Sequence, residues 1–242
     1  MREEVRLLSV SDVLEPLSEE ELEQLARRCP DTRLEPGEVF FTPDEDLERL
    51  FVLKEGRIQV YKVSPEGQEI TLAVVRDGAI FGEMALTAQR LRESYARAME
   101  PSVVMSLRHK DLEDLIRSNV EVGFRLVRSL SEQLRRCETR LEDVAFKEVP
   151  ARLASQILEL VEREGVASGK GYLIPTHYTH DQLASMIGAN RVSVSRAFAE
   201  LREVGAVESR GRRVLIRDLH SLGRAAQDER RARRIAEEFD RG

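Results

Sequence analysis

The side chains best suited to chemistry in this sequence are arginines in its last third. Arg191 and Arg196 follow a glycine turn, and Arg210, Arg212 and Arg213 lie in a short basic segment further along the chain. A guanidinium group can donate two hydrogen bonds to O6 and N7 of guanine. It can also bind phosphates by charge alone. The spacing therefore predicts a surface that binds nucleic acid.

The residues around the first two arginines have the pattern of a helix–turn–helix. Thr179 is a good N-cap, and Gln182 can complete a capping box with it. Gly188 stands where the first helix must end, and Asn190 can cap the second. The second helix of such a motif lies in the major groove, with its first residues at base edges. The residues expected to contact DNA from this motif are Thr179, His180, Asn190, Arg191, Val192, Ser193, Ser195 and Arg196.

A basic hairpin is expected after the second helix. The segments 206–209 and 214–216 predict two strands, and Arg210, Arg212 and Arg213 lie between them. Such a tip would lie along the phosphates as a wing. The alternative is a solvated helix face followed by a basic turn. The complete order of cap, glycine turn, second helix and basic hairpin favours DNA binding.

A long helix is predicted from residue 119 to 146, where no proline occurs and apolar residues recur every seven positions. Four heptads favour a dimeric coiled coil over a helix packed on its own domain. A homodimer would match the two-fold symmetry of a palindromic DNA site. Cys137 is interpreted as a small apolar side chain rather than a redox switch. The expected interface residues are Val120, Val127, Leu130, Leu134, Cys137 and Leu141.

The first half of the chain predicts short antiparallel strands. Turn residues punctuate the segment 34–107, and the runs between them are rich in apolar and β-branched side chains. Regular short strands of this kind indicate a sandwich or jelly roll. Before them, residues 18–28 predict a helix that Ser18 caps with Glu21 in a capping box. The expected strands cover residues 39–41, 50–53, 57–63, 69–75 and 103–107.

Composition narrows the possible classes of protein. The 242 residues are 41% hydrophobic and 34% charged, enough apolar side chain for two folded domains. Residues 1–146 hold 21 Lys or Arg against 30 Asp or Glu, whereas residues 147–219 hold 11 against 9. Nucleic-acid binding is therefore expected only in the rear half. With no apolar run of membrane length, no signal peptide and two cysteines, a cytoplasmic protein with no membrane partner is expected.

Together these parts resemble the cyclic-AMP receptor/FNR (CRP/FNR) family of bacterial transcription regulators over residues 30–218. The recognition segment 191–196 is most similar to that of the cyanobacterial nitrogen-control regulators. The motifs that carry the likeness are Glu35-Pro36-Gly37, Leu50-Phe51-Val52-Leu53, Gly56, Gly67-Gln68-Glu69-Ile70, Phe81-Gly82-Glu83-Met84, the long helix and Thr179 to Arg196.

The family implies an α+β chain with an N-terminal β-roll of jelly-roll type, a long dimerisation helix and a C-terminal winged helix–turn–helix. The expected domains are 1–118 for the cyclic-nucleotide-binding-like β-roll, 119–146 for the dimerisation helix, 147–219 for the DNA-binding domain and 220–242 for a charged extension. The alternating charges of that extension predict a solvated helix.

The resemblance also indicates where a small effector would bind. Nucleotide-binding members use a Gly-Glu pair for the ribose, an Arg-Ser pair for the phosphate and a Thr-Ser pair for the base. Gly82-Glu83 matches the first pair, but Arg92-Glu93 and Cys137-Glu138 replace the others. A carboxylate beside a phosphate repels it, and a thiol is a weaker hydrogen-bond partner than a hydroxyl. The nucleotide pocket is therefore expected to be degraded.

No cofactor, metal or catalytic residue is expected. Cys29 alone cannot hold the iron–sulfur cluster of the oxygen-sensing branch. The histidines, of which the first is His109, do not fall where the haem-binding branch needs one. A metal enzyme built on the β-roll would need histidine ligands on the strands, and none precedes His109.

The sequence therefore predicts a homodimeric transcription regulator that binds palindromic double-stranded DNA without cyclic AMP. We expect an activator that recruits RNA polymerase. The alternative is the same regulator with an obligatory small effector, such as cyclic AMP or 2-oxoglutarate.

Overall fold

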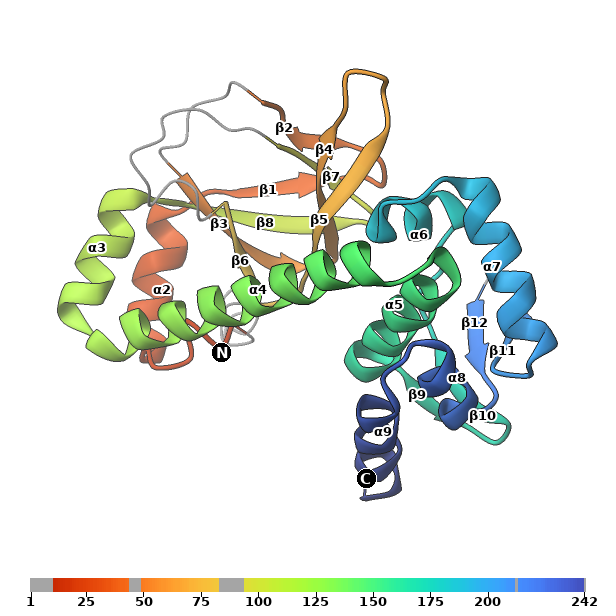
Figure 1. Ribbon diagram of the computed structural model, residues 1–242. Coiled ribbons are helices and arrows are strands. Elements are labelled where there is room, and N and C mark those ends of the chain that lie inside the picture. Colours follow the sequence, from red (N-terminus) through yellow and green to blue (C-terminus); the bar gives the residue numbers. More distant parts are fainter. Residues whose placement is uncertain (1–10, 44–48, 83–93, 212, 242) are drawn as a thin grey trace. The chain divides into compact units, whose positions relative to one another are not determined.

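The computed structural model describes residues 11–43, 49–82, 94–211 and 213–241. The chain divides into two compact units, Met1–Arg136 and Cys137–Gly242 (Figure 1). In the described parts of the chain, no helix has both the length and the apolar composition needed to cross a membrane.

The described residues of the first unit form two four-stranded antiparallel sheets. One sheet has the strand order β1 (Asp31–Leu34), β8 (Ser102–Arg108), β3 (Arg49–Glu55) and β6 (Ile80–Phe81). The other has the order β2 (Val39–Phe41), β7 (Tyr95–Ala98), β4 (Arg57–Val63) and β5 (Glu69–Arg76). The five predicted strands are confirmed, and the short strands β1, β6 and β7 were not predicted.

Strand alternation separates two apolar clusters. Phe51 and Leu53 of β3 lie in a cluster that draws on both sheets, where the Phe51 and Phe81 ring centroids are 5.3 Å apart. Leu50 and Val52 of the same strand belong to a second cluster formed with helices. Because successive side chains point to opposite faces, β3 contributes one face to the core between the sheets and the other face to the contact with the helices.

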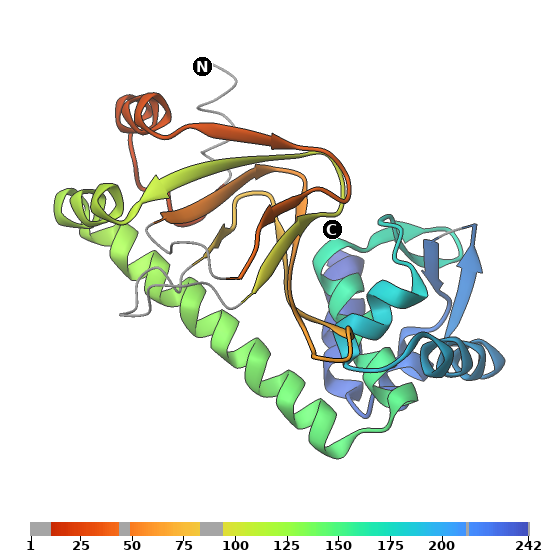
Figure 2. The ribbon, with the colours of Figure 1, turned by 90° about the horizontal axis from the view of Figure 1, so that it is seen from above.

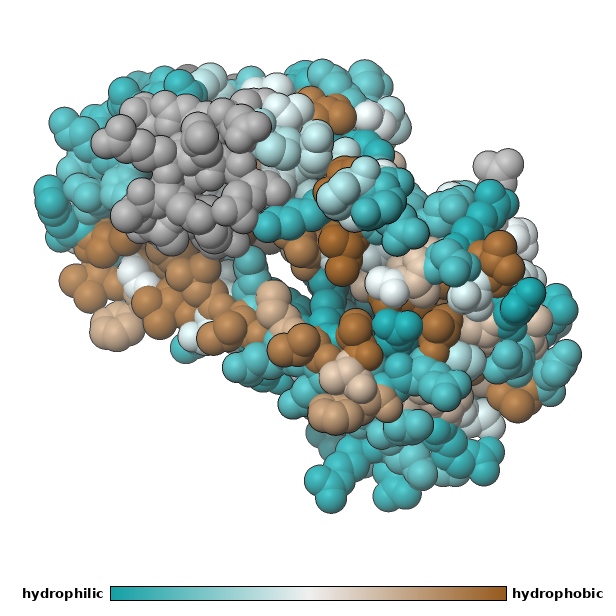
Figure 3. Space-filling model, turned by 45° about the horizontal axis from the view of Figure 1, so that its top comes forward, coloured by the Kyte–Doolittle hydropathy of each residue, from teal (hydrophilic) through white to brown (hydrophobic). Residues whose placement is uncertain are grey.

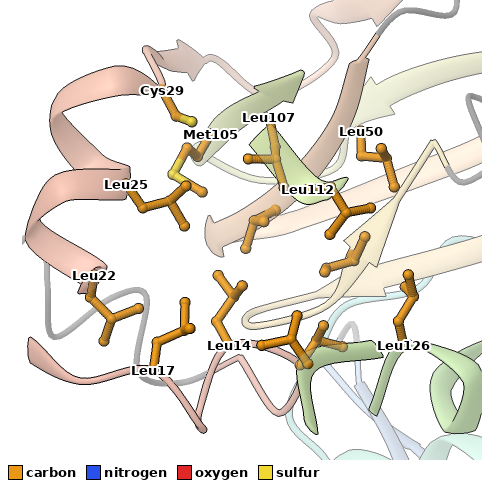
Figure 4. Packing of buried hydrophobic residues seen from close by; sticks show 14 residues of the cluster. Leu14, Leu17, Leu22, Leu25, Cys29, Leu50, Met105, Leu107, Leu112 and Leu126 are labelled. Atoms are coloured by element: carbon orange, nitrogen blue, oxygen red, sulfur yellow. The ribbon is translucent and has the colours of Figure 1, made fainter. Parts of the chain in front are cut away.

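The helical layer consists of α2 (Glu19–Arg28), α3 (His109–Ser118) and the first turns of α4 (Val120–Phe146). Figure 4 shows leucines of these helices in one apolar cluster with Met105 and Leu107 of β8. The predicted capping box of α2 is present, with the Ser18 backbone N–H donating to Glu21 at 2.8 Å. Cys29 is buried in this layer, and burial raises the pKa of its thiol to about 11, which leaves little reactive thiolate.

Helix α4 is apolar on more than one face. Val122 and Leu126 are buried in the helical layer, and Leu130 is half-buried against it. The remaining apolar side chains are exposed on the single chain, and Figure 3 shows apolar surface gathered along this helix. These exposed residues are Val120, Phe124, Val127, Leu134, Leu141, Val144 and Phe146.

The second unit surrounds α5 (Val149–Glu164), which is buried on most of its circumference. A four-stranded antiparallel sheet has the order β11 (Val207–Arg210), β12 (Arg213–Ile216), β10 (Gly171–Ile174) and β9 (Val166–Ser168). The helices that follow α5 in this unit are α6 (His180–Ile187), α7 (Arg191–Glu203), α8 (Leu219–Ala225) and α9 (Glu229–Arg241).

The prediction that the C-terminal extension is a solvated helix is wrong for one face of α9. Ala232 and Ile235 are buried, and the ring of Phe239 lies 4.7 Å from that of Tyr172 on β10. These three residues recur at about one per helical turn, so they form a narrow apolar stripe within a charged sequence. The prediction relied on the alternating charges of the segment and overlooked this apolar stripe.

Ion pairs reinforce the packing of α9. Arg231 Nε donates to Glu162 of α5 at 2.9 Å, and Arg234 also binds this carboxylate. Burial favours a higher pKa for Glu162, but the hydrogen bonds and charges of the two arginines outweigh it and lower the pKa. The folded state therefore binds a proton on Glu162 less well than the unfolded chain does.

Glu162→Gln should destabilise the protein at neutral pH by about 1–2 kcal/mol, because two arginines lose a charged partner. The stability due to Glu162 is present above its ordinary pKa of 4.5 and is lost as the pH falls through its lower folded value. Thermal melts should therefore separate variant and wild type at pH 7 and bring them closer together at low pH. Glu148→Gln is the matched control, because its exposed side chain makes no capping hydrogen bond. Equal melting temperatures for wild type and Glu162→Gln at pH 7 would contradict this account.

Candidate nucleic-acid interface

Helix α6 begins with the predicted capping box. Thr179 Oγ1 accepts from the Gln182 backbone N–H at 3.1 Å, and Gln182 Oε1 accepts from the Thr179 N–H at 2.8 Å. The helix ends at Gly188, whose φ of +62° lies in the left-handed region that glycine adopts without strain. Cap and glycine together fix where the chain leaves α6 and turns toward α7.

Helix α7 presents polar and apolar side chains on different faces. Asn190 caps it by accepting from the Ser193 N–H at 2.8 Å. Its inner face is buried, whereas Arg191, Val192 and Arg196 are exposed and Ser193 is half-buried. The buried residues are Val194, Ala197, Phe198 and Leu201. The outward residues of the first two turns are those expected to reach base edges.

Side chains also connect the first turns of the two helices. His180 Nδ1 lies 2.8 Å from Ser195 Oγ, and Ser195 Oγ donates to the Arg191 carbonyl at 2.9 Å. Arg191 Nη1 lies 3.4 Å from Asp181 Oδ2, an ion pair that joins residues of α6 and α7. Asp181 was not among the predicted site residues, since an acidic residue in a DNA-binding motif does not by itself indicate a role in binding.

The predicted basic hairpin is formed by β11 and β12. Arg210 and Arg213 are paired across its end, and both are exposed. Gly211 makes the turn with φ of +65°, and Arg212 lies outside the described residues. Figures 1 and 2 both place this hairpin beside α7. The hairpin therefore extends the basic surface that α7 begins.

A buried carboxylate fixes the segment that leads into α6. Glu164, the last residue of α5, accepts from Tyr178 Oη at 2.6 Å and from Thr176 Oγ1. Glu164 and Tyr178 are both buried. These bonds hold the segment that leads into Thr179, the cap of α6. No local pattern predicts this role, because a glutamate at a helix end is ordinarily solvated.

The predicted effector residues are only partly described. Gly82 follows β6 with φ of +79°, whereas Glu83, Arg92 and Glu93 lie outside the described residues. Cys137 and Glu138 are exposed on α4. Because three of the six candidates lie outside the described residues, their assembly into one effector site stays a prediction.

Two family models match the chain. Residues 31–119 match the cyclic nucleotide-binding domain, and residues 151–225 match the Crp-like helix-turn-helix domain. These ranges coincide with the two sheets of the first unit and with the elements from α5 to α8 of the second.

Similar proteins of known role are transcription regulators. The CRP-like cAMP-activated global transcriptional regulator of Mycobacterium tuberculosis is 29% identical over 79% of this chain and 85% of the relative. A global nitrogen regulator of Synechocystis is 30% identical over 69% of this chain and 75% of the relative.

A solved structure agrees with these relatives. A CRP-family transcriptional regulator from Thermus thermophilus is 29% identical, with a TM-score of 0.69 over 81% of this chain and 97% of that one. The relatives and this structural neighbour are regulators rather than enzymes. The β-rich first unit, the long α4 and the capped pair α6–α7 thus fit one family, and the chain belongs to the CRP/FNR family of transcription regulators.

Proposed function

We propose that this protein is a homodimeric, sequence-specific regulator that binds palindromic DNA in the bacterial cytoplasm and does so without cyclic AMP. The observation that carries the proposal is the outward face of α7. Arg191, Val192 and Arg196 are exposed on the first two turns of a helix whose other face is buried. Arginine can grip guanine with two hydrogen bonds, and an apolar side chain such as Val192 can contact the methyl group of thymine.

Recognition and general attraction come from different parts of this surface. Arg191 and Arg196 would read bases, together with the capping and first-turn residues of the two helices. Arg210 and Arg213 of the hairpin would contact phosphates, which position the protein without reading sequence. The opposite charge balance of the two halves supports this arrangement, because the acidic first half would be repelled by DNA.

The exposed stripe on α4 supports the homodimer. Val120, Val127, Leu134 and Leu141 recur every seven residues, and each is at least 60% exposed on the single chain. A row of this kind is costly in water and is typical of an interface. Pairing of two α4 helices would cover it and would give the two-fold symmetry that a palindromic site requires.

Effector independence rests on changes in two of the three residue pairs of the family's nucleotide-binding pattern. Glu93 would repel a cyclic phosphate, and Cys137 with Glu138 would offer the base no paired hydroxyls. A ligand shifts a conformational equilibrium only by its differential affinity for the two states. A protein that binds the nucleotide poorly must rest in its DNA-binding state or respond to another signal.

A second candidate is the same regulator with an obligatory effector. It is favoured by the similar regulator from Mycobacterium tuberculosis, which is described as cAMP-activated.

By the family resemblance we also propose that the protein activates transcription by recruiting RNA polymerase.

Arg196→Ala should weaken binding to the preferred site by about 1–3 kcal/mol and relax the preference at one base pair. Arg213→Ala should weaken all duplexes alike and reduce the slope of log affinity against log salt by about one. Fluorescence anisotropy with a preferred and a scrambled duplex, each at several salt concentrations, measures both effects. An unchanged ratio of the two affinities for Arg196→Ala would contradict the base-reading role.

Leu134→Glu should convert the dimer into monomers, because it would place two carboxylates close together in an apolar seam. Sedimentation velocity at micromolar concentration would show the change. Thr139→Glu, an exposed polar position on another face of α4, is the control and should remain dimeric. A wild-type protein that sediments as a monomer would overturn the proposed homodimer.

The purified, ligand-free protein should bind its preferred duplex, and millimolar cyclic AMP should change the affinity little. Anisotropy titrations with and without the nucleotide test this expectation. A gain in affinity of about tenfold or more, equivalent to about 1.4 kcal/mol, would favour the obligatory-effector alternative instead.

A further inference from the structure

The first turns of α6 and α7 hold Arg191 at both its main chain and its side chain. Ser195 Oγ donates to the Arg191 carbonyl at 2.9 Å and contacts His180 Nδ1 at 2.8 Å. The guanidinium group lies next to Asp181, with 3.4 Å between Nη1 and Oδ2. An acidic side chain of the first helix thus accompanies a predicted base-reading arginine of the second.

The ion pair contributes little to folding stability. The side chains of Arg191 and Asp181 are 69% and 65% exposed, and water screens exposed pairs of this kind strongly. A carboxylate on a DNA-facing surface also opposes binding to any duplex, because it repels phosphates. Neither folding stability nor general affinity for DNA therefore explains the presence of Asp181 beside Arg191, which leaves the discrimination between DNA sequences.

We propose that Asp181 is a specificity-determining residue that orients the guanidinium group of Arg191 toward a guanine edge. This inference rests on the proposed DNA-binding function. Arg191 has five N–H donors, so one edge can face Asp181 while another donates to O6 and N7 of guanine. An untethered arginine can turn to a phosphate instead, and a phosphate contact carries no sequence information. Asp181 blocks that alternative by holding the group and by repelling phosphates.

The test uses the full-length protein, a duplex selected from a randomised pool and a scrambled duplex of the same composition. Asp181→Asn keeps the shape of the side chain and removes its charge. It should bind the scrambled duplex more tightly and lower the ratio of preferred to scrambled affinity about fivefold. In an Arg191→Ala background, the same substitution should leave the ratio unchanged, because the group that Asp181 orients is gone.

Glu203→Gln is the matched control, because it removes one exposed negative charge from the last turn of α7. It should tighten binding to both duplexes slightly and keep their ratio. The inference is overturned if Asp181→Asn behaves like this control, since its effect would then be general charge repulsion. A wild-type protein that shows no preference for any duplex would instead overturn the proposed function itself, so the two failures are distinguishable.

Discussion

The arrangement of the second unit depends on the burial of α5. Leu153, Ile157, Leu158 and Val161 are fully shielded from water, and even Gln156 is buried. A helix that is apolar on nearly all sides must be covered on nearly all sides. Helices α6, α7, α8 and α9 and strand β10 supply that cover. The two helices of the DNA-binding motif are therefore placed by the apolar surface that they share with α5, and the short turn between them only has to permit that placement.

Polar contacts then refine what the apolar packing has placed. Glu164 at the end of α5 is bound by Tyr178 and Thr176, which hold the entry to α6. The contact of His180 with Ser195 joins α6 to α7. A buried carboxylate that lacks partners is costly, so Glu164 favours one position of the entry segment. The exposed first turns of the two helices can consequently present arginines at a defined angle.

Helix α4 is the element that takes part in both units. Val122 and Leu126 are buried in the first unit, whereas the end of the helix is tied into the second by a lysine. Lys147 Nζ lies 2.7 Å from Asp143 of α4 and donates to Ser155 of α5 at 2.8 Å. Between these anchored ends lies much of the exposed apolar stripe. The same helix would thus carry the proposed dimer contact and the attachment of the DNA-binding unit.

The sequence alone was sufficient for the features that depend on neighbours within about one turn of helix. The caps at Ser18, Thr179 and Asn190 and the left-handed turn at Gly188 are of this kind, because each partner lies three or four residues away. Alternation along β4 and the absence of proline in α4 are equally local signals. These signals were enough to predict the fold class and the helix pair that carries the candidate site.

The features that join distant segments of the chain depend on tertiary packing. Strand β7 is short and weakly apolar, and it is a strand because β2 and β4 lie on either side of it. The apolar face of α9 could be identified only because it packs on α5 and β10. The structural role of Glu164 could be identified only because Tyr178 donates a hydrogen bond to its buried carboxylate. Asp181 acquired its partner when α6 and α7 packed on α5. Such contacts depend on which surfaces meet in the folded chain, and a local pattern of residue types does not predict which surfaces will meet.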